Sequence, residues 1–210
     1  MAPDANARER IYSSIREDLQ RGLYPPGARI DIQRIADQNH SSVTPVREVL
    51  ARLSGEALVQ PQRHGGFRAM HLDAPGLDGL YRWNALVLVG ATHLDVTTIA
   101  VQMPVSIRPG TTGESAAAGA VLVADIFLSL ATATRNRDVE RAVALGNTRL
   151  AYVRLVEGNV LRRLPEEIAN LAVQAANQDI PGLRRSILSY HQRRISHLPE
   201  LMKELPRFLD

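Results

Sequence analysis

Residues 25–69, PPGARIDIQRIADQNHSSVTPVREVLARLSGEALVQPQRHGGFRA, decide the fold of the N-terminal part of this chain. The Pro-Pro-Gly run at their start predicts a turn, because two prolines cannot continue a helix. Ile32, Ile35 and Ala36 then predict a short amphipathic helix that ends near residues 39–40.

A second helix is predicted to begin after Ser42, a residue type that commonly caps helix N-termini. Pro45 falls in the first turn of this helix, where the missing N–H costs nothing. The apolar stripe at Val46, Leu50 and Leu53 should face the core.

Strands complete the pattern. Residues 58–60 and 67–69 predict a pair of strands joined by a glycine-bearing hairpin loop at residues 61–66, and Arg29-Ile30 can form a short strand. Upstream, residues 11–19 carry apolar side chains at helical spacing. Three helices followed by a two-stranded wing predict a winged helix-turn-helix, an architecture that reads DNA.

The third helix of such a unit enters the major groove with its N-terminus first. Arg47 can form a two-pronged contact with guanine or hold a phosphate, and Thr44 can donate to a phosphate. The predicted DNA-contacting residues are Ser42, Thr44, Arg47, Arg52, Arg63, His64, Gly65 and Gly66.

At these residues the stretch resembles the N-terminal domain of GntR-family regulators. The matching positions are Pro26-Gly27, Ile35-Ala36, Ser42, Thr44-Pro45-Val46-Arg47-Glu48, Leu50, Leu53, Leu58-Val59 and Arg63-His64-Gly65-Gly66. The resemblance implies DNA contacts at Ser42, Thr44, Arg47, His64 and Gly65. Val43 stands where the family has a base-contacting arginine, which implies a different operator sequence.

The remainder of the chain should be wholly helical, with helices at 77–99, 115–134, 138–157, 164–178 and 180–198. The predicted fold is therefore mostly α. The expected organisation is a winged helix-turn-helix domain at 1–70, a linker at 71–76 and an all-helical effector-binding and dimerisation domain at 77–210. We expect the Pro75-Gly76 pair to end regular structure in the linker.

The helical part resembles the FadR-like, or FCD, effector domain at Leu80-Tyr81, residues 130–136, residues 166–179 and Tyr190-His191. Many such domains hold a divalent metal with one Asp and three His. The corresponding positions here are Val123, Phe127 and Ile168, with His191 offset by one residue from the fourth. Since a stable site takes three or four ligands, we predict no metal and no cofactor.

The resemblance also implies a small-molecule pocket in this domain. Its possible polar members are Asn84, Asp95, Arg149, Tyr152, Tyr190 and His191. For each of them a role in helix packing or at the surface is the alternative.

The composition sets further limits. The 210 residues are 45% hydrophobic with a net charge of +3 and no cysteine, which excludes disulfides and thiolate chemistry. Residues 116–134 carry a single charge, at Asp125, and consist mostly of small residues, which favours a core helix over a membrane span. The polar N-terminus is no secretory signal, so a cytoplasmic location is expected. No catalytic constellation is evident, so we predict that the protein is not an enzyme.

The predicted function is that of a sequence-specific transcription regulator. It would bind a palindromic double-stranded operator as a homodimer, associate with the nucleoid when bound, and respond to a small-molecule effector. One alternative is a regulator whose helical domain only dimerises. A more distant one is a helical enzyme with a DNA-binding appendage.

Overall fold

The computed structural model describes residues 3–63, 65–100 and 114–206. The chain divides into two compact units. One holds the residues up to Leu72 together with the C-terminal residues from Leu205, and the other holds Asp73–Glu204. We call them the N-terminal unit and the helical unit.

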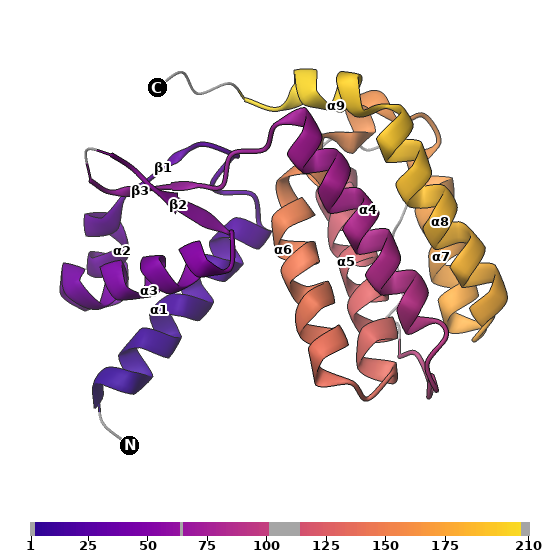
Figure 1. The fold of residues 1–210 in the computed structure, drawn as a ribbon, viewed down its shortest axis with the longest axis horizontal. Coiled ribbons are helices and arrows are strands. Elements are labelled where there is room, and N and C mark those ends of the chain that lie inside the picture. The colour runs from indigo at the N-terminus through magenta and orange to yellow at the C-terminus, as the bar shows by residue number, and fades with distance from the viewer. Residues whose placement is uncertain (1–2, 64, 101–113, 207–210) are drawn as a thin grey trace. The chain divides into compact units, whose positions relative to one another are not determined.

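The N-terminal unit is built from helices and one small sheet (Figure 1). Its elements are α1 (Pro3–Gln20), β1 (Arg29–Ile30), α2 (Ile32–Gln38), α3 (Val43–Gly55), β2 (Val59–Pro61) and β3 (Phe67–Ala69). The sheet is antiparallel in the order β1-β3-β2, so β3 is its central strand. The predicted winged helix-turn-helix is confirmed, with β1 added at the edge of the wing.

Its core follows from the predicted apolar stripes. Helices α1 and α3 pack against each other, and Ile11 and Ile15 of α1 and Leu50 and Leu53 of α3 are fully buried. Ser42 occupies the N-cap position of α3 with extended backbone, but its side chain makes no capping hydrogen bond. Its hydroxyl is therefore not committed to capping α3.

All regular elements of the helical unit's described residues are helices (Figure 1). They are α4 (Ala74–Ala91), α5 (Glu114–Ala133), α6 (Arg137–Val160), α7 (Leu164–Ala176), α8 (Ile180–Ser196) and α9 (Leu198–Glu204). The predicted all-helical architecture is confirmed. Its core consists mostly of leucine, isoleucine, valine and alanine at helical spacing.

The first helix of this unit differs from the sequence prediction. The Pro75-Gly76 pair does not end regular structure but lies in the first turn of α4. Asp73 caps this helix by accepting from the Gly76 N–H at 2.8 Å, and proline suits a first turn because it needs no hydrogen-bond partner there. α4 ends at Ala91 rather than near residue 99.

The apolar helix α5 packs inside the helical unit. Ile126, Phe127 and Leu130 are fully buried against the neighbouring helices. The window Ala116–Ala133 has a mean hydropathy of 1.9, which by length and composition would suit a membrane span. The buried core helices of water-soluble proteins meet the same criterion, so the hydropathy alone is weak evidence for a membrane.

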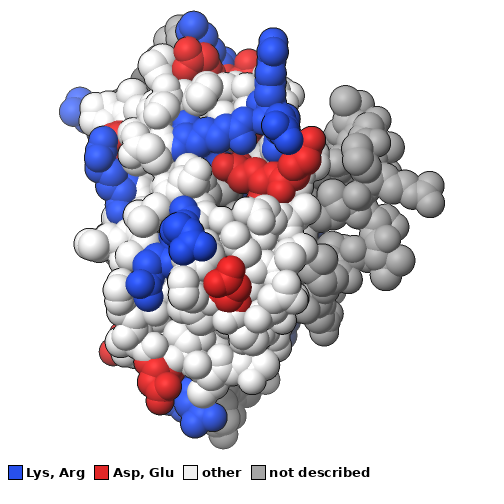
Figure 2. All heavy atoms as spheres, turned by 90° about the vertical axis from the view of Figure 1, so that its right-hand side faces the viewer, with Lys and Arg blue, Asp and Glu red and all other residues white. Residues whose placement is uncertain are grey.

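One face of the helical unit, which looks to the right in Figure 1, carries α7 and α8. Figure 2 shows that charged side chains there form small separate groups on a mostly uncharged surface. The described part of this face offers no continuous basic strip for the phosphates of DNA.

Candidate DNA-binding interface and buried polar cluster

The start of α3 and the wing surround one groove of about 630 Å³ in the N-terminal unit. Its lining residues are Arg29, Ile30, Asp31, Ile32, Gln33, Val43, Arg47, Gly65 and Gly66. Of the predicted contacts, Arg47 and the two glycines thus share a single depression. Ser42 and Thr44 are exposed beside it at the N-terminus of α3.

The wing tip is shaped by two glycines. Gly65 and Gly66 have φ angles of +85° and +89°, a region that side-chain-bearing residues rarely adopt. A Cβ at either position would meet nothing within 4 Å, so the backbone there is open to a ligand. Arg63 is exposed next to them, and His64 lies outside the described residues.

Arg52, a predicted DNA contact, is held by side chains of the N-terminal unit itself. Its guanidinium lies over the Tyr12 ring of α1, with 3.9 Å between Cζ and the ring centroid. Its Nη1 also lies 3.3 Å from a carboxylate oxygen of Glu9, and its Nε 3.6 Å from one of Glu56. Arg52 therefore joins α3 to α1 and does not line the groove.

Six of the nine groove residues were not predicted as contacts, among them Arg29 and Gln33. Arg29 is exposed on β1, and Gln33 is exposed near the start of α2. The pairing of Arg29 with Arg68 in β3 brings β1 beside the wing. The sequence suggested the strand but not its partner, so it gave no sign that Arg29 lies at the groove.

A set of polar side chains is buried inside the helical unit. This buried polar cluster comprises Tyr81, Asn84, Arg154, Glu157, Tyr190, His191 and Arg194. Arg194 is fully buried and binds carboxylate oxygens of Glu157 at 2.7 Å and Glu167 at 3.0 Å. The Tyr81 hydroxyl donates to the other oxygen of Glu157 at 3.1 Å. Burial opposes the charge of Arg194, but Glu157, Tyr190 and Glu167 together outweigh it and raise the pKa of the guanidinium.

His191 is neutral in this cluster. Its Nδ1 lies 2.7 Å from the Ile187 carbonyl oxygen, which can only accept, so Nδ1 carries the proton. Its Nε2 then accepts from the Asn84 side-chain amide at 3.0 Å. Burial lowers the pKa of His191 to about 3, which agrees with this assignment.

Several polar atoms of the cluster have no hydrogen-bond partner among the described residues. They are Asn84 Oδ1, Tyr190 Oη, Arg194 Nε, and Nε and Nη2 of Arg154. Buried polar atoms are nearly always partnered in native proteins, so a group of them needs an explanation.

The predicted effector residues fall into two sets. Asn84, Tyr190 and His191 come together in the cluster, where Tyr190 and His191 have ring centroids 5.0 Å apart. Asp95 is exposed beyond the end of α4. Arg149 and Tyr152 are partly buried on α6, and burial lowers the pKa of Arg149. Arg154, which has the largest number of unpartnered atoms in the cluster, was not among the predicted residues.

The positions that hold metal in related domains are apolar here and lie in the core. Val123, Phe127 and Ile168 belong to one buried hydrophobic cluster, and the Phe127 ring stacks on His191 with centroids 5.8 Å apart. Within residues 3–63, 65–100 and 114–206, no three His, Asp or Glu side chains gather as a metal site would require. The absence of a bound metal remains a prediction.

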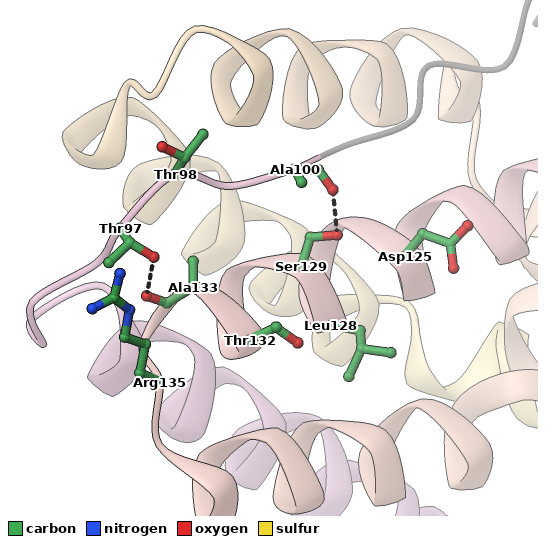
Figure 3. Close-up of a pocket in the computed structure, with 9 residues that line it drawn as sticks. All are labelled: Thr97, Thr98, Ala100, Asp125, Leu128, Ser129, Thr132, Ala133 and Arg135. Atoms are coloured by element: carbon green, nitrogen blue, oxygen red, sulfur yellow. Dashed lines mark hydrogen bonds between the residues drawn. The ribbon is translucent and has the colours of Figure 1, made fainter.

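A second depression, of about 530 Å³, lies on the outer side of α5 (Figure 3). Thr97, Ser129, Asp125 and Arg135 are among its lining residues. The Ser129 and Thr97 hydroxyls donate to the carbonyls of Ala100 and Ala133, both at 2.9 Å. Partial burial raises the pKa of Asp125. None of the predicted effector residues lines this depression.

Residues 7–68 match the family model described as bacterial regulatory proteins, gntR family. The N-terminal unit therefore contains a GntR-family helix-turn-helix domain. The match covers the groove-forming helix and both wing strands, so the predicted family resemblance is confirmed on the same residues.

Similar proteins cover almost the whole regulator. The Nta operon transcriptional regulator of Aminobacter aminovorans is 24% identical over 186 residues, which are 86% of this chain and 89% of that protein. The structure of McbR/YncC from E. coli has a TM-score of 0.68 at 18% identity, covering 96% of this chain and 100% of that one. A GntR regulator from Rhodococcus sp. RHA1 has a TM-score of 0.69 at 13% identity, covering 95% and 99%. At these identities the two structures establish the fold alone.

Together the family match and the Aminobacter relative make this chain a DNA-binding transcription regulator and not an enzyme, as predicted.

Proposed function

We propose that this regulator binds a palindromic double-stranded operator as a homodimer through α3 and the wing, and that a small-molecule effector bound in the helical unit changes its affinity for DNA. The buried polar cluster with its unpartnered atoms carries the effector part of the proposal. A helical unit of the FCD type would serve both dimerisation and effector binding.

The groove gives each DNA contact a role. Arg47 is exposed at the groove and makes no ion pair with any described residue, so its guanidinium is available for a base or a phosphate. Ser42 and Thr44, with the free N–H groups at the start of α3, suit phosphate oxygens. Val43 offers an apolar surface to a thymine methyl group in place of the family's arginine. In the wing, Arg63, His64, Gly65 and Gly66 would contact the adjoining backbone.

Homodimerisation follows from the small size of a single winged unit. Two such units held together bind the halves of a palindrome with a high effective concentration for the second contact. The helical unit is the part of the chain left to hold them together. Binding to chromosomal DNA also implies a cytoplasmic location.

The alternative, a helical unit that only dimerises, accounts less well for the cluster. A unit selected for packing alone would gain from apolar side chains, because buried unpaired polar groups cost stability. The presence of such groups at Asn84, Arg154 and Tyr190 favours a unit that binds something.

The DNA part is tested with operators selected from random double-stranded DNA by the purified full chain. Arg47→Ala should weaken operator binding by about 1–3 kcal/mol, the usual value of a two-pronged base contact. Arg21→Ala is a matched control, because Arg21 is an exposed arginine of the same unit outside the groove. Selected sites without a palindrome, or equal losses in the two variants, would contradict the proposal.

The effector part is tested by screening metabolites for an increase in the melting temperature of the full chain, since a ligand of the native state stabilises it. A compound that stabilises the protein and also changes operator affinity in a mobility-shift assay supports an effector. Stabilising compounds that never change operator affinity would favour the dimerisation-only alternative.

A further inference from the structure

The depression on the outer side of α5 carries opposite charges at its two ends (Figure 3). Asp125 and Arg135 are the charged residues of its described lining, and neither pairs with an opposite charge in the described part of the chain. Partial burial raises the pKa of Asp125, so this carboxylate is partly dehydrated as well as unpaired. Asp125 and Ala133 are eight positions apart on α5, a rise of about 12 Å, and Arg135 follows two residues later. A single small ion cannot reach both ends.

One wall of the depression is the segment at residues 97–100, which is tied to the helices behind it. Thr97 and Ala100 are bonded to residues of α5. The Ile99 N–H donates to Gln178 Oε1 at 2.9 Å, and the Ile99 carbonyl accepts from Gln178 Nε2 at 3.1 Å. The side-chain amide of Gln178 thus pairs with this backbone as a neighbouring strand would, and the wall is held in place without a ligand.

Thr98 is the residue of this segment that makes no such bond. It lines the depression and is exposed, and its backbone N–H and carbonyl have no hydrogen-bond partner among the described residues. A free peptide group of this kind can pair with the backbone of another chain, as the edge of a sheet does.

We propose that this depression binds a short peptide with free termini, its α-ammonium on the Asp125 carboxylate and its C-terminal carboxylate on the Arg135 guanidinium. Three extended residues span about 10–11 Å, which suits the separation of the two charges. The peptide groups between the termini pair with Thr98, and Leu128 and Ala100 offer apolar surface to small side chains. The site shares no residue with the buried polar cluster, so it does not depend on the effector proposed for that cluster.

The probes are L-alanine, dialanine and trialanine, titrated into the full chain at about pH 6.5, where both termini are charged. N-acetyl-trialanine lacks the ammonium, and trialanine amide lacks the carboxylate. Titration calorimetry should show trialanine binding at least tenfold more tightly than alanine and at least fivefold more tightly than either capped form. The amide N–H resonance of Thr98 should shift in NMR spectra when trialanine is added. These comparisons use the wild type alone and do not depend on the folding of any variant.

Two variants assign the ends. Asp125→Asn should abolish the preference for trialanine over its N-acetyl form, and Arg135→Gln the preference for trialanine over its amide. Each variant should leave the other preference in place. Glu166→Gln and Arg141→Gln are the matched controls, because both residues are exposed members of the helical unit outside the depression, and both should preserve the two preferences.

Undetectable binding of trialanine at millimolar concentration overturns the inference. Binding of alanine as tight as that of trialanine also overturns it, because the length of the ligand would then not matter. The same holds if either capped form binds as well as trialanine, or if Asp125→Asn and Arg135→Gln keep both preferences as the controls do.

Discussion

Replacing Arg194 by methionine should remove the interaction that holds the helical unit's buried charges together. Arg194 is fully buried and donates to Glu157 at 2.7 Å, to Glu167 at 3.0 Å and to the Tyr190 carbonyl at 2.9 Å. Its Cζ lies 3.2 Å from the Tyr190 ring centroid. Methionine can fill the space of the aliphatic stem but replaces none of these contacts.

The loss can be sized from what remains. Glu157, whose side chain is 3% exposed, would keep the Tyr81 hydroxyl as its one side-chain hydrogen-bond partner among the described residues. Removing one member of a buried ion pair costs about 3–5 kcal/mol. In a protein of this size each kcal/mol shifts the melting temperature by roughly 2–4 °C, so we expect a fall of about 6–20 °C.

Urea and thermal unfolding followed by far-UV circular dichroism measure this effect. Adding Glu157→Gln to Arg194→Met should recover much of the lost stability, because no unpaired carboxylate then remains at that position. Arg141→Met, an exposed pair on the same helix as Glu157, should change little. A single Arg194→Met variant within about 1 kcal/mol of the wild type, or a double variant as unstable as the sum of the singles, would refute the reasoning.

Four further outcomes are expected. Arg52→Ala should lower the unfolding free energy by about 1 kcal/mol, because the contact with Tyr12 of α1 is lost. Operator affinity in a mobility-shift assay should stay unchanged. A large loss of affinity would instead show that Arg52 contacts DNA. Gly66→Ala should cost about 1–2 kcal/mol in urea unfolding because its φ is +89°, whereas Gly55→Ala, with ordinary φ and open space, should cost nothing. The unfolded chain protonates the His191 imidazole near pH 6.5 and the folded one only near pH 3, so stability should fall by up to about 1.4 kcal/mol per pH unit below pH 6.5, and His191→Gln should flatten that slope. Elemental analysis of chain purified without chelator should find zinc, nickel and manganese far below one equivalent, and stoichiometric metal inside the helical unit would refute the prediction.

The sequence predicted best those features that depend on neighbours along the chain. The stripes at Ile11 and Ile15 and at Leu50 and Leu53 have helical spacing, and each proved to be the buried side of its helix. The glycines of the wing also kept the role expected of them, because positive φ angles restrict the residue type.

It predicted less well the features that depend on which helices meet. Arg52 has the exposed spacing of a DNA contact, and only the packing of α1 on α3 reveals that Tyr12 and Glu9 hold it. Nothing in the sequence singled out Arg154. Its Nε and Nη2 lack partners because Arg194, forty residues later, binds the nearby carboxylates. The start of α4 was missed because a proline ends helices in most places but is favoured in a first turn.

The position of β3 at the centre of the sheet has a mechanical consequence. Arg68 is paired with Arg29 on one side and with Gln60 on the other, so the wing is tied by hydrogen bonds to β1. One residue after β1 the chain enters α2, whose first turn also borders the groove. A wing joined only by its own loop could swing freely, but this one has to carry Arg29 and the start of α2 with it. The distance between the wing tip and α3 is therefore restrained. We expect the protein to bind poorly to operators with insertions that would require a different distance.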